Sequence, residues 1–141
     1  MSAAESRPAA ATTAFWLLVA GGVLLVLAGL ITATVSFTTL RNAQPPEVSD
    51  QSIYDMLWLN RGVGILFGVA GLALIWLAVR ARNRDLRFRR AAMTLGLTIV
   101  VVVAAASFYG GHILALLSLV PIVTGTLLLR RPSVVDWYAN G

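Results

Sequence analysis

Four long apolar stretches, separated by short polar segments, give the chain its pattern. They cover residues 14–37, 56–79, 91–109 and 113–129. An α-helix rises 1.5 Å per residue, so about 20 apolar residues cross a hydrocarbon core about 30 Å thick. The last stretch is at the lower length limit and contains Pro121, which is expected to kink it. The pattern predicts an all-α membrane protein whose four transmembrane helices form an up-down antiparallel bundle over residues 14–129.

The polar segments between and around these stretches are short. Residues 1–13 are small and polar, which predicts a disordered cytoplasmic tail, and residues 130–141 form a second cytoplasmic tail. Residues 38–54 are the only substantial loop; Pro45-Pro46 argues against a helix there, and the loop is acidic. The junction at 110–112 is a tight hairpin, too short to carry a site of its own.

The basic residues, all of them arginine, are distributed unevenly between the two sides of the predicted bundle. Two arginines, Arg41 and Arg61, fall on one side. The other side has nine, namely Arg7, Arg80, Arg82, Arg84, Arg87, Arg89, Arg90, Arg130 and Arg131. Because basic residues are retained on the cytoplasmic side of a membrane, both termini are expected inside. The acidic loop and the hairpin then face outward.

Composition supports the membrane class and narrows the cellular setting. The chain is 58% hydrophobic and only 12% charged, too little charge to cover a soluble domain. Its net charge of +5 therefore reflects topology, and no nucleic-acid partner is expected. The absence of cysteine excludes disulfides and thiolate metal sites. The absence of lysine, with Ala, Val, Leu, Gly and Arg dominating, is typical of a GC-rich bacterial genome and indicates a bacterial plasma membrane.

Arg61 is the one charge predicted to lie inside an apolar stretch, about one turn from its outer end. A charge there must snorkel, pair with a carboxylate or line a wet cavity. One interpretation is an outward-facing polar site formed by Asn60, Arg61, Asp50, Asp55, Tyr109 and His112. The other, which we favour, is snorkelling to the headgroups beside Asp55 or another loop carboxylate.

The arginine run between the second and third stretches also has two interpretations. It predicts contact with anionic phospholipids at the cytoplasmic face through Arg80, Arg82, Arg84, Arg87, Arg89, Arg90, Arg130 and Arg131. The simpler interpretation is that these residues only determine topology. Within the run, Asp85 is expected to pair with Arg89 at (i, i+4).

Small and aromatic residues are placed as helix packing and the bilayer require. Gly22, Gly29 and Ser36 recur at seven-residue intervals, and Gly64 and Gly68 are four apart, so helices are expected to approach closely at these positions. Similar pairs are Ala92 with Gly96 and Pro121 with Gly125. Trp137 and Tyr138 are expected to lie flat on the inner surface as part of an aromatic belt.

Chemistry-bearing patterns are scarce. No charge lies at the middle of an apolar stretch, and we find no Ser/His/Asp set, paired carboxylates or phosphate-binding glycine loop. His112 is the only histidine and has no nearby ligand residue, so no metal or other cofactor is expected. These patterns favour a non-enzymatic protein.

The order of features resembles a loose group of small four-span membrane proteins of actinobacteria. The residues that carry the resemblance are Leu59-Asn-Arg-Gly-Val-Gly64, the arginine-rich hinge Arg82–Arg90, and the tail Leu129-Arg-Arg-Pro-Ser-Val-Val-Asp-Trp-Tyr138. The resemblance implies four helices in a bacterial plasma membrane and carries over no catalytic residue. We expect an accessory or scaffold subunit that binds other membrane protein subunits; the alternative is a small-solute or lipid-handling protein with an outward site around Arg61.

Overall fold

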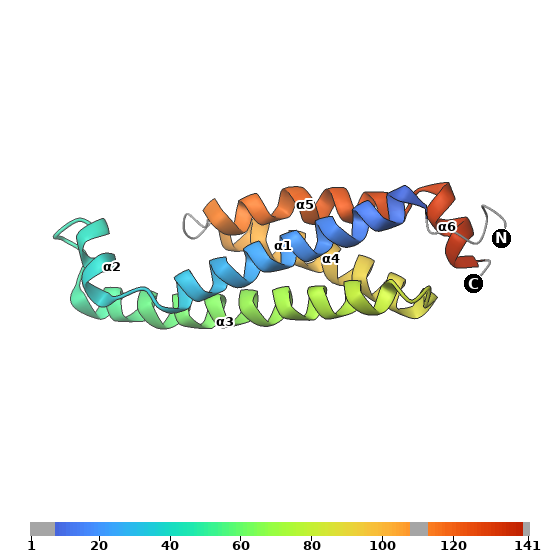
Figure 1. The fold of residues 1–141 in the computed structure, drawn as a ribbon. Helices are drawn as coiled ribbons and strands as arrows, with labels where there is room; N and C mark the ends of the chain where they lie inside the picture. The colour runs from blue at the N-terminus through green and yellow to red at the C-terminus, as the bar shows by residue number, and fades with distance from the viewer. Residues whose placement is uncertain (1–7, 108–112, 140–141) are drawn as a thin grey trace.

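The computed structural model describes residues 8–107 and 113–139, and nearly all of them are helical. Figure 1 shows the long helices lying alongside one another, with a short helix at either end of the molecule. The helices are α1 (Ala9–Ala33), α2 (Phe37–Ala43), α3 (Asp50–Ala81), α4 (Leu86–Ser107), α5 (Ile113–Leu129) and α6 (Pro132–Ala139). The described residues contain no strand. The all-α class predicted from the apolar pattern is confirmed.

Three of the helices, α1, α3 and α4, are long and apolar enough to cross a membrane. The 17-residue α5 reaches that length only together with α6, and the two helices meet at an angle of 60°. The chain therefore has three candidate spans, or four if α5 and α6 are counted as one bent span. This supports a membrane protein.

The helices α1, α3 and α4 begin earlier than the apolar pattern predicted, and α1 also ends earlier, at Ala33. Helix α1 begins at Ala9, so the expected disordered tail does not reach Thr13. Helix α3 begins at Asp50, where the side chain of Ser49 accepts a hydrogen bond from the Ser52 amide at 3.2 Å. A serine N-cap of this kind satisfies one of the free amides in the first turn of a helix. The polar residues before position 56 therefore continue the helix instead of forming a loop.

The expected loop at 38–54 contains a helix, which is a correction to the prediction from Pro45-Pro46. The prolines lie after α2 and do not interrupt it, and Ser36 caps it by accepting from the Thr39 amide at 3.1 Å. The turn beyond α2 is held by Arg41, which donates to the carbonyls of Pro45 and Val48, at 2.6 Å each, and pairs with Asp50 at 3.1 Å. Proline disrupts a helix only when it lies in the helix interior, and these prolines follow the last residue of α2.

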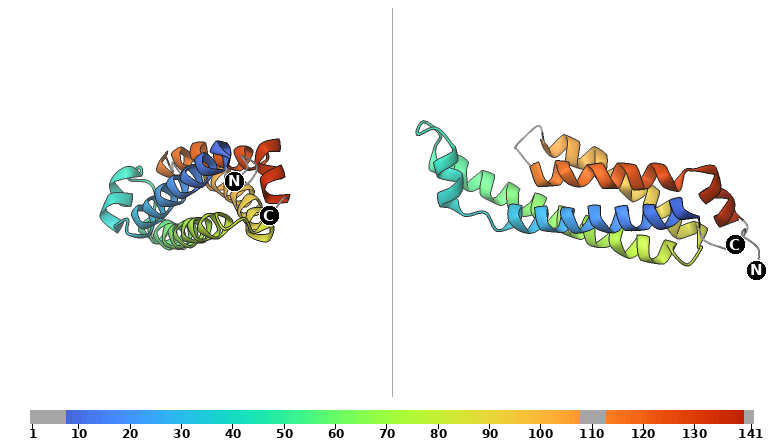
Figure 2. Two further views of the ribbon diagram at one scale, coloured as in Figure 1. Left: turned by 45° about the vertical axis from the view of Figure 1, so that its right-hand side comes forward. Right: turned by 45° about the horizontal axis from the view of Figure 1, so that its top comes forward.

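Helix α1 packs between α3 and α5, and α4 completes the group by contacting α3 and α5 (Figure 2). Glycines on α1 face glycines on α3. A Cβ built on Gly29 would lie 2.5 Å from the Gly64 carbonyl oxygen, and one built on Gly71 would lie 2.6 Å from the Gly22 carbonyl oxygen. The predicted use of Gly22 and Gly29 in close packing is confirmed.

One of the other small residues does not serve as predicted, since Ser36 lies beyond the end of α1 and caps α2 instead of packing. The backbone of Gly68 does lie at the contact with α1, because a Cβ on Gly29 would lie 2.7 Å from the Gly68 amide nitrogen. A Cβ on Gly68 itself would meet nothing within 4 Å. Gly96 and Gly125 do lie at contacts, Gly96 against Thr126 and Gly125 against Leu18. Small residues thus bring α1, α3, α4 and α5 together within one chain, as expected where lipid removes the hydrophobic driving force.

Candidate functional site

Eight arginines lie at one end of the helices, which we call the arginine-rich end. They are Arg80, Arg82, Arg84, Arg87, Arg89, Arg90, Arg130 and Arg131. They occupy the end of α3, the start of α4 and the junction of α5 with α6. The start of α1 and the end of α6 lie at the same end of the molecule (Figure 1).

Three helix C-termini meet at the arginine-rich end, and each has a carbonyl bound by a side chain from another element. Arg89 donates two hydrogen bonds to the Leu129 carbonyl at the end of α5, from Nε at 3.1 Å and from Nη2 at 2.7 Å. Arg84 Nε donates to the Trp137 carbonyl near the end of α6 at 2.7 Å. The last carbonyls of a helix have no partner within it and carry its negative dipole end, so a guanidinium fits them well.

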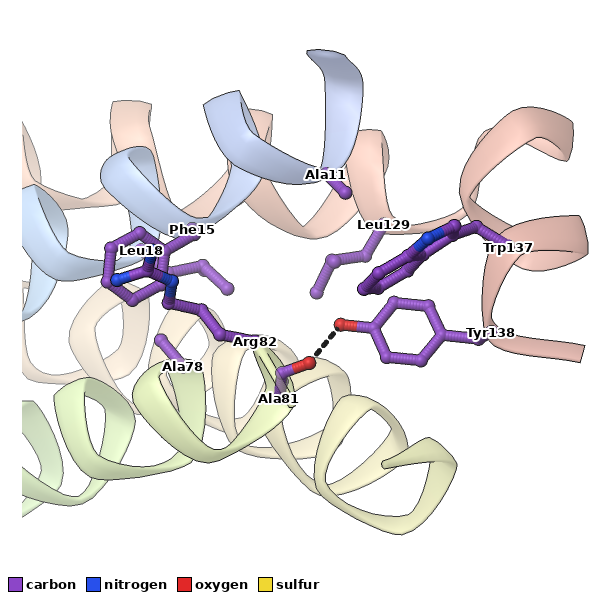
Figure 3. A pocket seen from close by; sticks show the side chains of 9 residues that line it. All are labelled: Ala11, Phe15, Leu18, Ala78, Ala81, Arg82, Leu129, Trp137 and Tyr138. Carbon is purple, nitrogen blue, oxygen red and sulfur yellow. Dashed lines mark hydrogen bonds between the residues drawn. The ribbon is translucent and has the colours of Figure 1, made fainter. Parts of the chain in front are cut away.

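The third carbonyl belongs to α3. Tyr138 Oη donates to the Ala81 carbonyl at 2.6 Å, shown as a dashed line in Figure 3. We call the set of these three interactions the C-terminal clasp: Arg84 with Trp137, Arg89 with Leu129, and Tyr138 with Ala81. The clasp joins α6 to both ends of the α3–α4 turn. Trp137 and Tyr138 are 7% and 5% exposed, so the prediction that they lie flat on the inner surface is wrong.

Aromatic rings receive several of the remaining charges at this end. The guanidinium carbon of Arg82 lies 4.5 Å from the centre of the Phe15 ring, and that of Arg84 lies 4.7 Å from the Trp137 ring. Arg80 lies 5.4 Å from Trp76. A cation over a ring face is attracted by the ring quadrupole, by about 0.5–1 kcal/mol at exposed sites. These arginines are therefore engaged within the chain.

The hollow enclosed by the clasp does not accommodate a substrate. Figure 3 shows Phe15, Leu18 and Ala11 from α1 facing Ala78 of α3 and Arg82, which follows α3, with Trp137 and Tyr138 closing one side. Its volume is about 10 Å³. That is about the minimum needed for one water molecule. The clasp is a structural joint.

Asp85 has a different partner from the one the sequence predicted. Its carboxylate accepts from the Arg87 backbone amide at 2.9 Å and pairs with Arg87 Nη2 at 3.4 Å, which caps the start of α4. The side-chain hydrogen bond from Arg87 is the main cause that lowers the pKa of Asp85. The predicted pair with Arg89 is absent because Arg89 points to the end of α5.

Three exposed arginines at this end have neither a carboxylate nor an aromatic ring as a partner among the described residues. They are Arg90, Arg130 and Arg131. Arg90 follows Arg89 in α4, and Arg130 follows Leu129, whose carbonyl Arg89 binds, so both lie near Arg89. That the arginines of this end contact anionic lipid stays a prediction.

At the opposite end, the predicted outward polar site is not assembled by the residues that the structure describes. Arg61 is exposed and stacks over Trp58, with 5.2 Å from its guanidinium carbon to the ring centre. Asp50 pairs with Arg41, and Asp55 accepts from Gln51 at 3.2 Å. No hydrogen bond or ion pair joins Arg61 or Asn60 to either carboxylate within the described ranges. Tyr109 and His112 lie outside the described residues.

The spacing of charges along α3 explains the position of Arg61 without an outward polar site. Arg80 lies nineteen positions after Arg61, and all the residues between them are uncharged. At 1.5 Å per residue this is about 28 Å, close to the thickness of a hydrocarbon core of about 30 Å. Arg61 therefore lies at the boundary of the apolar part of α3. The first turns of the helix, before Arg61, lie outside this apolar part.

Sequence reasoning missed the clasp because its partners are distant in the sequence. Arg84 and Trp137 are 53 residues apart, and the acceptors are backbone carbonyls that no residue type reveals. The available signal was a basic segment before one helix and an aromatic pair after another.

No group of three or more potential metal ligands occurs among the described residues. Comparison with protein-family models, curated proteins and solved structures finds no match to this chain.

Proposed function

We propose that the chain crosses the plasma membrane of a bacterium four times, as an up-down antiparallel bundle with both termini in the cytoplasm. The count of nine arginines against two supports this sidedness. So does the gathering of eight of them at the end where α1 begins and α6 ends. The uncharged segment between Arg61 and Arg80 matches one crossing by α3.

Within that topology, we propose that the protein is a non-enzymatic accessory or scaffold subunit of a larger membrane complex. The observation that carries the proposal is that several polar side chains of the helices hydrogen-bond within the chain. Four hydroxyls in α4 and α5 donate to a carbonyl three or four residues earlier in their own helix, namely Thr98, Ser107, Ser118 and Thr124. The clasp uses the polar groups of α6 in the same way.

The surface that the long helices present to their surroundings is largely apolar. Large hydrophobic side chains on every long helix are more than half exposed, such as Ile31 on α1, Ile65 on α3, Val101 on α4 and Val120 on α5. Lipid tails or the helices of another membrane protein are the surroundings that such faces require. A protein with these faces and short connections is suited to packing against a partner.

The test is purification of the tagged full chain from its native membrane in a mild detergent, followed by mass spectrometry and native gel electrophoresis. We expect a membrane partner at constant stoichiometry and a complex well above the mass of the chain. An unrelated tagged multispan protein purified in parallel is the control. A single species that contains only this chain would contradict the proposal.

Photo-crosslinking locates the contact on the intact membrane. A photoreactive amino acid replaces Ile65 on α3 or Val120 on α5, which are 63% and 65% exposed, and Gln51 serves as the control outside the apolar segment. We expect one of the two membrane positions to cross-link the partner identified by purification. Absence of cross-linking at both positions, with the partner absent from the purified material, would remove the support for a subunit role.

The alternative function, an outward site for a small solute or lipid around Arg61, receives no support from the geometry. Arg61 stacks on Trp58 and is not joined to the acidic residues before it among the described residues.

A further inference from the structure

An apolar groove runs between α4 and α5 and opens on the surface of the molecule. Its volume is about 390 Å³, within the range of about 300–1,000 Å³ typical of ligand pockets. Its walls are Met93, Thr94, Gly96, Leu97 and Val100 from α4, and Val123, Thr126, Leu127 and Arg130 from α5. Gly96 lets the helices approach at the floor, since a Cβ there would lie 2.7 Å from Thr126 Oγ1.

One end of the groove is positively charged. Arg130 lines it at the arginine-rich end, and Arg90 lies three and four residues before the lining residues Met93 and Thr94, on the same face of α4. Arg89 is committed to the Leu129 carbonyl. Arg90 and Arg130 are exposed and have no carboxylate partner within the described ranges. The groove is therefore apolar along its length and has a positive charge without a carboxylate partner at one end.

The dimensions of the groove favour a slender occupant. Its α5 wall extends from Val123 to Arg130, about 10 Å at 1.5 Å per residue. An α-helix is about 10–12 Å in diameter with its side chains, so it would lie over the open mouth of the groove and insert only side chains into it. A hydrocarbon chain is much narrower, and nothing but hydrocarbon or protein is available at this depth of a membrane.

We propose that this groove is a binding site for an anionic phospholipid, with one acyl chain between α4 and α5 and the phosphate held by Arg130 and Arg90. The argument is one of complementarity: the occupant must combine a negative headgroup with a thin apolar tail. The site does not depend on the proposed role as a subunit, because all its residues belong to this chain.

The first test separates the groove arginine from its neighbour. The full chain is purified in a neutral detergent, and phosphatidylglycerol or phosphatidylcholine is titrated while native mass spectrometry counts the bound lipid. We expect the wild type to retain one phosphatidylglycerol more tightly than phosphatidylcholine. Arg130→Gln should weaken phosphatidylglycerol retention about fivefold, the effect of about 1 kcal/mol for one arginine. Arg131→Gln is the matched control and should leave it unchanged.

A second pair of variants tests the apolar part of the site. Val123→Phe places a larger side chain in the groove, and we expect it to reduce retention of phosphatidylglycerol severalfold. Val120→Phe adds the same bulk on α5 outside the groove and should have no effect. If Val123→Phe does not fold, Leu127→Phe at the more exposed groove wall replaces it.

Several results would overturn the proposal. Equal losses in Arg130→Gln and Arg131→Gln would mean that lipid only adheres to a charged surface. Unchanged retention in Val123→Phe and Leu127→Phe would mean that the groove is not used. The chain contains no cysteine, so Leu97→Cys also reports on a second copy. Efficient disulfide formation between two such copies in the membrane would mean that protein, not lipid, covers the groove.

Discussion

Arg84 is held in a left-handed backbone conformation, with φ at 68°, in the turn between α3 and α4. Residues with a Cβ pay about 1–2 kcal/mol for this conformation. The same residue donates to the Trp137 carbonyl and stacks on the Trp137 ring. The turn that strains the backbone thus directs the guanidinium toward α6, and the contacts it makes there offset the strain.

Two substitutions separate the strain of Arg84 from its contacts. Arg84→Ala removes the contacts and keeps the strain, and we expect it to lower the free energy of unfolding by about 2 kcal/mol. Arg84→Gly removes the same contacts but accepts a positive φ, so it should be more stable than the alanine variant by about 1 kcal/mol. Unfolding in mixed micelles, followed by circular dichroism, measures both. Identical stabilities would show that the backbone at this turn is not strained.

At the scale of the elements, α1 and α3 pack with their backbones in close contact. The backbones approach where Gly22 faces Gly71 and Gly29 faces Gly64. Such contacts replace side-chain interlocking with direct contact between backbones, which the membrane environment favours. A side chain added at one of these glycines would therefore force the two helices apart.

Gly64→Ala tests that contact with a control on the same helix. The added Cβ would lie 2.5 Å from the Ala33 amide nitrogen and 2.5 Å from the Gly29 carbonyl oxygen, so α1 and α3 must separate. We expect a loss of about 1–3 kcal/mol in the free energy of unfolding. Gly62→Ala, where nothing lies within 4 Å, should be neutral or slightly stabilising because alanine favours a helix. Equal stabilities of the two variants in the same unfolding assay would contradict the observed packing.

The long helices were predictable from the sequence, and so were the bounds of α5, but the starts of α1, α3 and α4 were not. An apolar stretch such as Gly62–Val79 leaves no alternative to a helix in a membrane, because every backbone group must be paired internally. The start of α3 depends instead on Ser49 as a cap, and the existence of α6 depends on contacts with α3 and α4 that are remote in sequence. The groove at Arg130 could not be predicted from the sequence either, since hydrophobic periodicity does not give the distance between two packed helices.

At the scale of the whole molecule, charge is separated between the two ends. The arginine-rich end has eight arginines and two aspartates among the described residues, Asp85 and Asp136. The end with α2 has Arg41 and Arg61 against Glu47, Asp50 and Asp55. This separation is what a fixed orientation in the membrane requires, and it does not depend on the details of helix packing.

Single cysteines test the orientation directly, because the chain contains none of its own. Gln51→Cys lies near the start of α3 and Ala139→Cys at the end of α6, and both positions are exposed. In intact cells an impermeant thiol reagent should label Gln51→Cys, and Ala139→Cys only after the membrane is permeabilised. Labelling of Ala139→Cys in intact cells would place the C-terminus outside and contradict the proposed topology.

The length of α3 has a consequence for the kind of membrane that the protein fits. The helix has 32 residues, about 48 Å, but only the part between Arg61 and Arg80 is free of charge, about 28 Å. Tilting can shorten the thickness that this segment spans but cannot lengthen it. At the arginine-rich end the clasp ties the end of α3 to α6, so little unwinding is available there. Bilayers thicker than this segment would have to thin locally around α3 or draw the guanidinium of Arg61 below the headgroups. The protein is thereby matched to membranes of ordinary or lesser thickness.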